Sequence, residues 1–330
     1  MKNAIIVHGT GGYPEENWFP WLKKELEHVG YKVSVPQFPT IEGIPPKVSE
    51  WFDVLENYEI NQETIFIAHS MGGLFTLRIL EKLEHPVKAV FFVGTPVGIK
   101  PIKFYDQDKL FSGFDFNWDK IRVSAEHFEV FHSDNDPYVC LGNGEKLSEE
   151  LGVRLNFVPN AGHFNTSAGY TQFPDLFKVI MDKEYMDLAI ELSAKAIYPY
   201  GAIIVKDGQI IGRSDTDTPV AKTQFGHAEI TAIEEAMSHL GGHLCAEGGK
   251  GATIYSSCEP CAMCMGAILY TGINRLVYGA TLEDSKECVN EILANAQKIA
   301  DACTNRTVEI IPEYGRKQAV KVLKYWRDKQ

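Results

Sequence analysis

Two short runs in the second half of the chain hold the residue types that bind and use a catalytic metal. A His-Ala-Glu run at 227–229 is followed by a Pro-Cys-Ala-Met-Cys run at 260–264. One imidazole and two thiolates leave a fourth position open on zinc, which is the arrangement of catalytic sites. Zinc lowers the pKa of water in that position to about 7, and Glu229 can move protons. We predict one Zn²⁺ per chain, held by His227, Cys261 and Cys264.

The spacing of these residues agrees with local helical structure. Two cysteines three positions apart share one face of a helical turn, and Pro260 suits the first position of that helix. His227 opens a second helix-forming run. Both thiols would then lie near a helix N-terminus, where the helix dipole favours the thiolate form. One alternative is a structural zinc site in which Cys258 supplies a fourth ligand.

The His-Ala-Glu and Pro-Cys-x-x-Cys pair resembles the signature of the zinc-dependent cytidine deaminase superfamily. The run at 253–270 is most similar to the guanine deaminase and tRNA adenosine deaminase branch, and the resemblance covers roughly residues 183–330. It implies a three-layer α/β/α domain with Glu229 as the proton shuttle. It also implies deamination of a nucleobase or nucleoside-like amino-heterocycle, with guanine as the first candidate.

One part of the deaminase half departs from this pattern. Purine-acting relatives usually carry an asparagine about eleven residues before the zinc histidine, where it reads the base. This chain has Ser-Asp-Thr-Asp at 214–217 instead. Asp215 or Asp217 could bind a ring N–H, or both could be turn residues. The zinc chemistry is unaffected, but the identity of the substrate is left open.

The first half of the chain holds a second set of reactive residues, each at the end of an apolar strand. Ser70 follows the strand expected at 64–68 and precedes an apolar helix pattern, which is the context of a nucleophile elbow. Asp136 and His163 follow strands expected at 128–131 and 155–158. All three side chains would therefore meet at the C-terminal edge of a parallel sheet.

The chain order of serine, aspartate and histidine is that of α/β-hydrolases. His163 would take the proton of Ser70, and Asp136 would hold the imidazole in the correct tautomer. Asp134 competes with Asp136 for that role. The backbone N–H groups of Thr10 and Met71 would stabilise the oxyanion.

These motifs resemble the small single-domain serine hydrolases of the retinoblastoma-binding serine hydrolase type, over roughly residues 1–180. The match includes the His-Gly-Thr-Gly-Gly loop at 8–12, whereas Ala68 replaces the first glycine of Gly-x-Ser-x-Gly. The resemblance implies hydrolysis of an ester, thioester or amide. The alternative is an inert relative of the fold that serves as an interaction scaffold.

Length and element pattern indicate an α/β protein of two domains. At 330 residues the chain exceeds one typical domain. We expect a small α/β-hydrolase domain at 1–181, with a parallel sheet and helices on both faces. A cytidine deaminase-like domain at 182–330 follows, reading αββαβαβαβα with a single helix over 283–302. No Pro/Gly/Ser linker separates the two domains, so we expect either that the two domains pack closely or that the junction helices run nearly continuously.

Composition bounds the partners and the compartment. Residues 1–181 hold 16 Lys and Arg against 24 Asp and Glu, and residues 182–330 hold 16 against 20. Net charges of −8 and −4 do not favour nucleic acid, so small-molecule substrates are expected. No apolar run reaches membrane-spanning length. The N-terminus enters a strand directly and the seven cysteines suit reduced thiols, which predicts a cytoplasmic protein.

The leading hypothesis is a bifunctional enzyme, in which a serine hydrolase is fused to a zinc-dependent deaminase. A homodimer through the deaminase domain is one assembly open to such a chain. Two alternatives remain. One is a tRNA adenosine deaminase with an accessory hydrolase-fold domain, and the other is a deaminase whose hydrolase-fold half is a non-catalytic scaffold.

Overall fold

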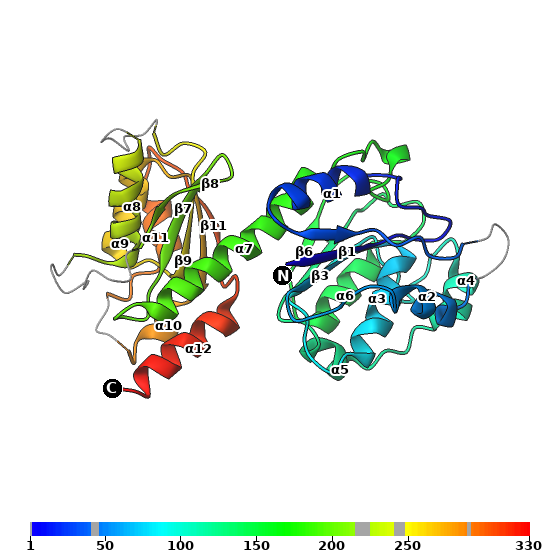
Figure 1. Ribbon diagram of the computed structural model, residues 1–330. Coiled ribbons are helices and arrows are strands. Elements are labelled where there is room, and N and C mark those ends of the chain that lie inside the picture. Colours follow the sequence, from blue (N-terminus) through cyan, green and yellow to red (C-terminus); the bar gives the residue numbers. More distant parts are fainter. Residues whose placement is uncertain (1, 41–45, 215–224, 241–247, 289–291) are drawn as a thin grey trace. The chain divides into compact units, whose positions relative to one another are not determined.

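The computed structural model describes residues 2–40, 46–214, 225–240, 248–288 and 292–330. The chain divides into two compact units, Met1–Phe177 and Lys178–Gln330 (Figure 1). This division and the predicted domain boundary at 181/182 both fall within one helix, α7 (Pro174–Lys195). The two junction helices expected from the sequence are therefore a single helix of 22 residues.

The first unit is built on a six-stranded sheet in the order β2-β1-β3-β4-β5-β6, with every neighbouring pair parallel. Four of its strands are continuous apolar or nearly apolar runs that are buried along their whole length, as is usual for a parallel sheet covered on both faces. The strands are β1 (Asn3–Val7), β2 (Lys32–Ser34), β3 (Thr64–His69), β4 (Ala89–Val93), β5 (Phe128–His132) and β6 (Leu155–Phe157).

Helices cover both faces of this sheet. The main core joins one face to α2, α3, α5 and α6, and aromatic contacts between Trp18 and Phe173 and between Phe131 and Phe173 join the start of α7 to the other face. The helices are α1 (Phe19–His28), α2 (Val48–Leu55), α3 (Met71–Lys82), α4 (Tyr105–Ser112), α5 (Trp118–Val123), α6 (Gly142–Leu151) and the short 3₁₀ helix η1 (Thr166–Ala168).

The second unit is built on a mixed five-stranded sheet in the order β11-β10-β9-β7-β8. Strands β9, β10 and β11 are parallel to one another, whereas β7 is antiparallel to both β8 and β9. The hairpin between β7 and β8 turns at Asp207 and Gly208, which both have positive φ as a type I′ turn requires. The strands are β7 (Ala202–Lys206), β8 (Gln209–Arg213), β9 (Thr253–Cys258), β10 (Arg275–Ala280) and β11 (Glu309–Ile311).

Two apolar cores sandwich this sheet into the expected three layers. One core joins it to α8 (Ala228–His239), α9 (Ala262–Thr271) and α11 (Ala296–Ala302). The other joins it to the second part of α7 and to α12 (Arg316–Arg327). Figure 1 shows α8 and α9 on the face opposite α7 and α12. The α/β fold class predicted for both domains is confirmed.

Two local predictions in this unit are wrong. The helix expected over 283–302 is interrupted: α10 spans Leu282–Ser285 and α11 begins at Ala296. The Glu259 carboxylate accepts hydrogen bonds from the N–H groups of Leu282 and Ala296, which fixes two separate helix starts. Pro260 is not the first residue of the cysteine helix, because Cys261 is the N-cap residue and α9 begins at Ala262.

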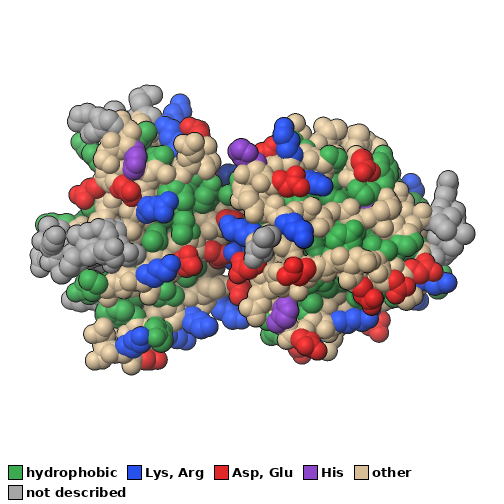
Figure 2. Space-filling model, in the orientation of Figure 1, with side chains coloured by type: hydrophobic (Ala, Val, Ile, Leu, Met, Phe, Trp, Pro, Cys, Tyr) green, Lys and Arg blue, Asp and Glu red, His purple; other side chains and the backbone are tan. Residues whose placement is uncertain are grey.

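Charges of both signs are interspersed over the face of each unit drawn in Figure 2. No described helix is both long enough and apolar enough to cross a membrane.

Candidate active sites

Ser70 lies at the sharp turn between β3 and α3. Its backbone has φ 56° and ψ −127°, a conformation that a residue with a side chain adopts only under constraint. The Ser70 N–H donates to the carbonyl of Val93 at the end of β4, and the Ser70 carbonyl accepts from Gly73. The turn is thus held from both sides, as a nucleophile elbow requires.

Close approach of α3 to the sheet explains the small residues around Ser70. A Cβ atom on Gly72 would lie 2.4 Å from the carbonyl oxygen of Val7, and one on Gly73 would lie 2.0 Å from Oγ1 of Thr95. Ala68, which replaces the first glycine of the motif, is a fully buried residue of β3. Its methyl group is therefore accommodated in the sheet.

His163 and Asp136 are paired at the same sheet edge. Nδ1 of His163 lies 2.6 Å from Oδ2 of Asp136. The other carboxylate oxygen of Asp136 accepts from the N–H groups of Tyr138 and Val139, at 2.8 and 3.0 Å. Asp134 instead accepts from the N–H of Asn160. Of the two candidate acids, the structure brings Asp136 to the imidazole and uses Asp134 to anchor the loop that leads to it.

Ser70, His163 and Thr10 line one cavity of about 440 Å³. Thr10 donates its hydroxyl hydrogen to the sulfur of Met71, at 3.3 Å, so the two residues predicted to form the oxyanion hole are neighbours. Met71 is the first residue of α3, and the N–H of that position has no partner within the helix. The loop of Thr10, the turn at Ser70 and His163, which are far apart in the sequence, thereby lie around one cavity.

Sequence reasoning missed three side chains that position His163. His69 lies 2.8 Å from the carbonyl of His163 through Nε2, and burial, together with the nearby His163, lowers the pKa of His69 to about 3. The Ser133 hydroxyl accepts from Ala161, and Asn135 accepts from Gly162. The Ser-Asp-Asn-Asp run is the signal that could have identified the last two, because such side chains commonly bind backbone N–H groups.

In the second unit, His227, Cys261 and Cys264 form one cluster. His227 and Cys261 are the N-cap residues of α8 and α9, so two helix N-termini converge on the same point. The Cys261 and Cys264 sulfurs lie 3.7 Å apart, and they lie 3.6 and 3.5 Å from Nδ1 of His227. Among the described residues this is the one group of three or more potential ligands with all ligand atoms within 4.8 Å of one another.

These separations fit a tetrahedral zinc ion. Bond lengths of about 2.3 Å to sulfur and 2.0–2.1 Å to nitrogen place tetrahedral ligands roughly 3.8 Å apart for two sulfurs and roughly 3.6 Å apart for sulfur and nitrogen. The hydrogen bond with Cys264, and then the one with His227, lowers the pKa of Cys261 to about 4, while the shared hydrogen bond with Cys261 raises the pKa of Cys264. The donor set and its spacing both suit zinc.

Glu229 is buried beside this cluster in the first turn of α8. Its carboxylate accepts a hydrogen bond from the Ser256 hydroxyl on β9, at 2.8 Å. Burial raises the pKa of Glu229 above its ordinary value. A carboxyl group with a raised pKa can both accept and release a proton near neutral pH.

The Cys258 and Glu259 side chains have structural partners. The Cys258 thiol donates to the carbonyl of Thr281, at 3.6 Å, and it is not part of the cluster of His227, Cys261 and Cys264. The described residues therefore do not form a closed four-ligand site that includes Cys258.

The region of the missing asparagine, including Asp215 and Asp217, lies outside the described residues.

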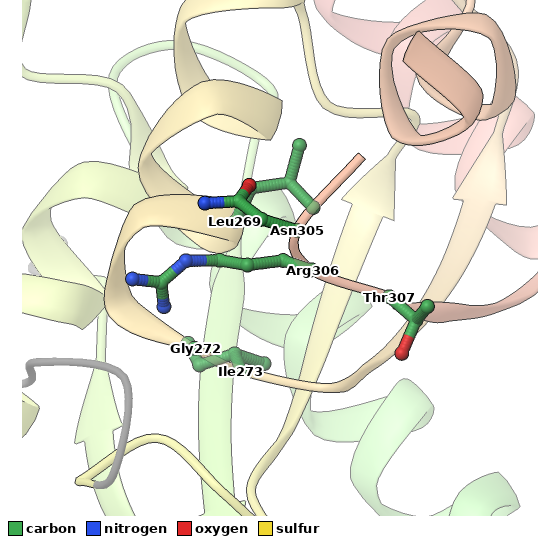
Figure 3. A pocket seen from close by; sticks show the side chains of 6 residues that line it. All are labelled: Leu269, Gly272, Ile273, Asn305, Arg306 and Thr307. Carbon is green, nitrogen blue, oxygen red and sulfur yellow. The ribbon is translucent and has the colours of Figure 1, made fainter. Parts of the chain in front are cut away.

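A separate cavity of about 260 Å³ lies at the C-terminal end of α9. Figure 3 shows Asn305 and Arg306, from the segment that leads into β11, beside Leu269 and Gly272. The ten residues of α9 span roughly 15 Å, so this cavity lies at the opposite end of the helix from Cys261. It is not part of the metal cluster.

Comparison with known proteins agrees with the two sites. Residues 4–182 match the serine hydrolase family model. The putative hydrolase YdeN of Bacillus subtilis (strain 168) is 29% identical over 184 residues, which cover 54% of this chain and 94% of that protein. The crystal structure of the B. subtilis ydeN gene product aligns with a TM-score of 0.52 at 28% identity, over 56% of this chain and 99% of that chain.

Residues 180–280 match the model of the cytidine and deoxycytidylate deaminase zinc-binding region. Guanine deaminase of B. subtilis is 38% identical over 89 residues, 27% of this chain and 54% of that protein. The tRNA-specific adenosine deaminase of the same bacterium is 36% identical over 103 residues, 30% of this chain and 62% of that protein. The chain thus spans about half of the first deaminase and somewhat more of the second.

Both resemblances inferred from the motifs are confirmed. The chain belongs to the serine hydrolase family, whose model covers residues 4–182, and it joins to this hydrolase unit a cytidine and deoxycytidylate deaminase zinc-binding region.

Proposed function

We propose that the protein is a bifunctional enzyme, with a serine hydrolase in the first unit and a zinc-dependent deaminase in the second. One observation carries each half. In the first unit, the 2.6 Å contact between His163 and Asp136 lies at the cavity of Ser70. In the second, three zinc-spaced ligands lie beside the buried Glu229.

In the hydrolase, Ser70 attacks the carbonyl carbon of an ester, thioester or amide while His163 accepts its proton. Asp136 keeps Nδ1 of His163 protonated, so that Nε2 is free to act as the base. The backbone N–H groups at Thr10 and Met71 donate to the oxyanion. His163 then protonates the leaving group, and water releases the acyl group from Ser70 by the same steps.

In the deaminase, His227, Cys261 and Cys264 would hold one zinc ion per chain. A bound zinc supplies the means to ionise water at neutral pH. Glu229 takes one proton from the attacking water and delivers it to the ring nitrogen. It then takes the remaining proton of the added hydroxyl group and delivers it to the amino group, which leaves as ammonia while the ring carbon becomes a carbonyl. The Ser256 hydroxyl, which donates to the Glu229 carboxylate, holds that carboxylate in place.

Guanine is the first substrate to test for the deaminase. The supporting observations are the 38% identity to guanine deaminase and a net charge of −4 over residues 182–330, which disfavours a polyanionic RNA. The 36% identity to a tRNA-specific adenosine deaminase makes tRNA adenosine the second candidate.

We also propose that both sites act on small molecules and that the protein has no nucleic-acid or membrane partner. The proposed assembly is a homodimer formed through the deaminase unit.

A cytoplasmic location is part of the proposal. The six described cysteines are free thiols, which suits a reducing compartment. The zinc-binding pair also requires reduced thiols.

Two assays on the full chain test this function. A fluorophosphonate probe should label Ser70, and a panel of free bases, nucleosides and tRNA should show which substrate releases ammonia. Release from guanine supports the proposal, and inosine formed in tRNA without ammonia from any free base supports the second candidate. A chain that deaminates but leaves Ser70 unlabelled and p-nitrophenyl esters intact has a hydrolase-fold scaffold instead.

A further inference from the structure

The cavity beside Ser70 holds more carboxyl groups than an acyl-transfer site needs. Two carboxylic acids line it in addition to the triad: Glu16, close to the loop of Thr10, and Asp108, in α4. None of the described residues that line it is a lysine or an arginine. Catalysis by Ser70 and His163 does not use either acid, which leaves both available to contact what the cavity binds.

Asp108 is the more unusual of the two. Its side chain is 4% exposed, and its Oδ1 atom has no hydrogen-bond partner among the described residues. Buried carboxylates are normally paired with a cation or satisfied by donors, because the loss of hydration costs several kcal/mol. A buried acid with one unpaired oxygen, in the wall of the Ser70 cavity, has the properties of a ligand-binding group without its ligand.

The pKa of Asp108 reflects the same burial. Burial raises the pKa of Asp108 to about 7 because nothing nearby compensates the charge. A neutral donor would satisfy one oxygen, but only a cation would also stabilise the ionised form. A positively charged donor is therefore the partner that would satisfy both the open oxygen and the ionised form of Asp108.

We propose that the hydrolase site takes substrates that carry a protonated amine, and that Asp108 is the residue that selects them by pairing with the ammonium group. This inference rests on the proposed hydrolase function. The substrate class is then an amino-substituted ester, thioester or amide. Aromatic rings of Tyr13, Phe104 and Tyr138 in the same cavity wall suit the apolar part of such a molecule and the face of its cation.

Neighbouring charges do not supply the missing cation. The nearest lysine on these rings is Lys103, whose Nζ lies 4.6 Å from the centre of the Tyr138 ring. Lys103 lines a separate hollow with Asp106. Asp106 is exposed on the same helix as Asp108 and does not line the Ser70 cavity, which makes it a matched control.

The experiment compares pairs of esters that differ only by exchange of ammonium for methyl. Methyl esters of glycine, β-alanine, 4-aminobutyrate and 6-aminohexanoate are each paired with the methyl alkanoate of equal length. A further pair, 3-aminopropyl acetate and butyl acetate, places the amine in the leaving group. Acid release by the full chain gives kcat/KM for each. The readout is the ratio of kcat/KM within each pair.

We expect at least one pair to show a preference for the ammonium ester of about 10-fold or more, the scale of a hydrogen bond to a charged group. Asp108→Asn should bring that ratio close to one, while Asp106→Asn should leave the ratio and both rates unchanged. Asp108→Asn should melt no lower than the parent, because it removes a buried charge. A ratio near one in every pair, or a preference that survives Asp108→Asn, overturns the proposal.

A binding measurement separates this inference from the proposed function. Saturation-transfer NMR on Ser70→Ala should detect n-hexylammonium more strongly than 1-hexanol, and the added Asp108→Asn change should abolish the difference. If no ester is hydrolysed and Ser70 is not labelled, the hydrolase function fails, but this arm still tests the cation site. Hydrolysis of neutral esters without ammonium binding leaves the hydrolase function intact and refutes the role of Asp108.

Discussion

Ser70 and Cys261 each stand immediately before a helix, α3 and α9, but the backbones around them differ. Ser70 has φ 56° and ψ −127°, whereas Cys261 has φ −66° and ψ 172°. The first is a constrained conformation and the second is ordinary extended backbone. His227, with φ −67° and ψ 156°, is also extended.

This contrast indicates what completes each site. In the hydrolase, protein atoms alone hold the reactive geometry, from the Val93 carbonyl at the elbow to the Asp136 carboxylate on His163. In the deaminase-like unit, the helix ends are relaxed, and a bound zinc ion would supply the positive charge that holds both cysteines as thiolates. Changes to side chains should therefore impair both sites, whereas removal of metal should impair only the second.

The largest expected effect is at Ser70. Ser70→Ala should lower kcat for acyl hydrolysis by about 10⁶-fold, since a triad acts as a unit, and His163→Ala should do the same. The double variant should lose little more. Deamination and zinc content of these variants, measured in the same preparations, should match the parent. Ester hydrolysis that survives Ser70→Ala would show that another nucleophile is at work.

The second largest expected effect distinguishes Asp136 from Asp134 as the acid of the triad. Asp136→Asn should reduce kcat for acyl hydrolysis by about 10⁴-fold, because the amide no longer holds the correct tautomer of His163. Asp134→Asn should cost far less, since Asp134 accepts from a backbone N–H at Asn160 and an amide oxygen can do the same. Steady-state kinetics on p-nitrophenyl esters measures both. Equal losses would contradict the assignment of Asp136.

The corresponding residue of the second unit is Glu229. Glu229→Gln should lower deamination by at least about 10²-fold, the scale of general acid–base catalysis. Zinc content, measured by elemental analysis, should stay at one ion per chain, whereas Cys261→Ala should lose the ion. Ser70 labelling should be unchanged in both variants. A metal-free Glu229→Gln protein would indicate that Glu229 is a ligand.

Chelation tests the contrast between the sites directly. Free zinc at 100 times its dissociation constant stabilises a folded unit by about 2.7 kcal/mol. Removal of zinc should therefore lower the melting temperature of the deaminase unit and end deamination. Fluorophosphonate labelling of Ser70 should continue at the same rate. If chelation abolishes the labelling, the two sites are coupled and the hydrolase site also depends on the metal.

Much of this could be predicted from the sequence because the informative features are local. Apolar strands that end in Ser70, Asp136 and His163 indicate one sheet edge, because parallel strands share their C-terminal ends. The cluster of His227, Cys261 and Cys264 was predictable because the three-residue spacing of the cysteines places both near one helix N-terminus, although the N-cap position of Cys261 was not predicted. Both patterns depend on secondary structure that the same residues encode.

What escaped prediction depends on contacts between distant residues. The break between α10 and α11 follows from the Glu259 carboxylate, which binds N–H groups 23 and 37 residues further along the chain. The sequence favoured Asp136 over Asp134, but the contact that distinguishes the two joins Asp136 to His163, 27 residues away. No periodicity in a single window contains this information. The burial of Asp108 could not be predicted from the sequence either, because it depends on how α4 packs in the folded protein.

The smallest expected effects come from two glycine-to-alanine substitutions, one in each unit, which should change the free energy of unfolding in opposite directions. Gly72→Ala should destabilise the hydrolase unit by roughly 1–3 kcal/mol, because its Cβ would lie 2.4 Å from the Val7 carbonyl oxygen. Gly266, exposed within α9, has nothing within 4 Å of a Cβ atom. Gly266→Ala should therefore stabilise the deaminase unit by about 0.5–1 kcal/mol, through the lower entropy of the unfolded chain. Urea denaturation resolves the two changes when Ser70 labelling monitors unfolding of the hydrolase unit and zinc release monitors unfolding of the deaminase unit. A neutral Gly72→Ala would mean that the elbow tolerates side-chain volume, and that the constraint on Ser70 does not depend on the close approach of α3 to β1.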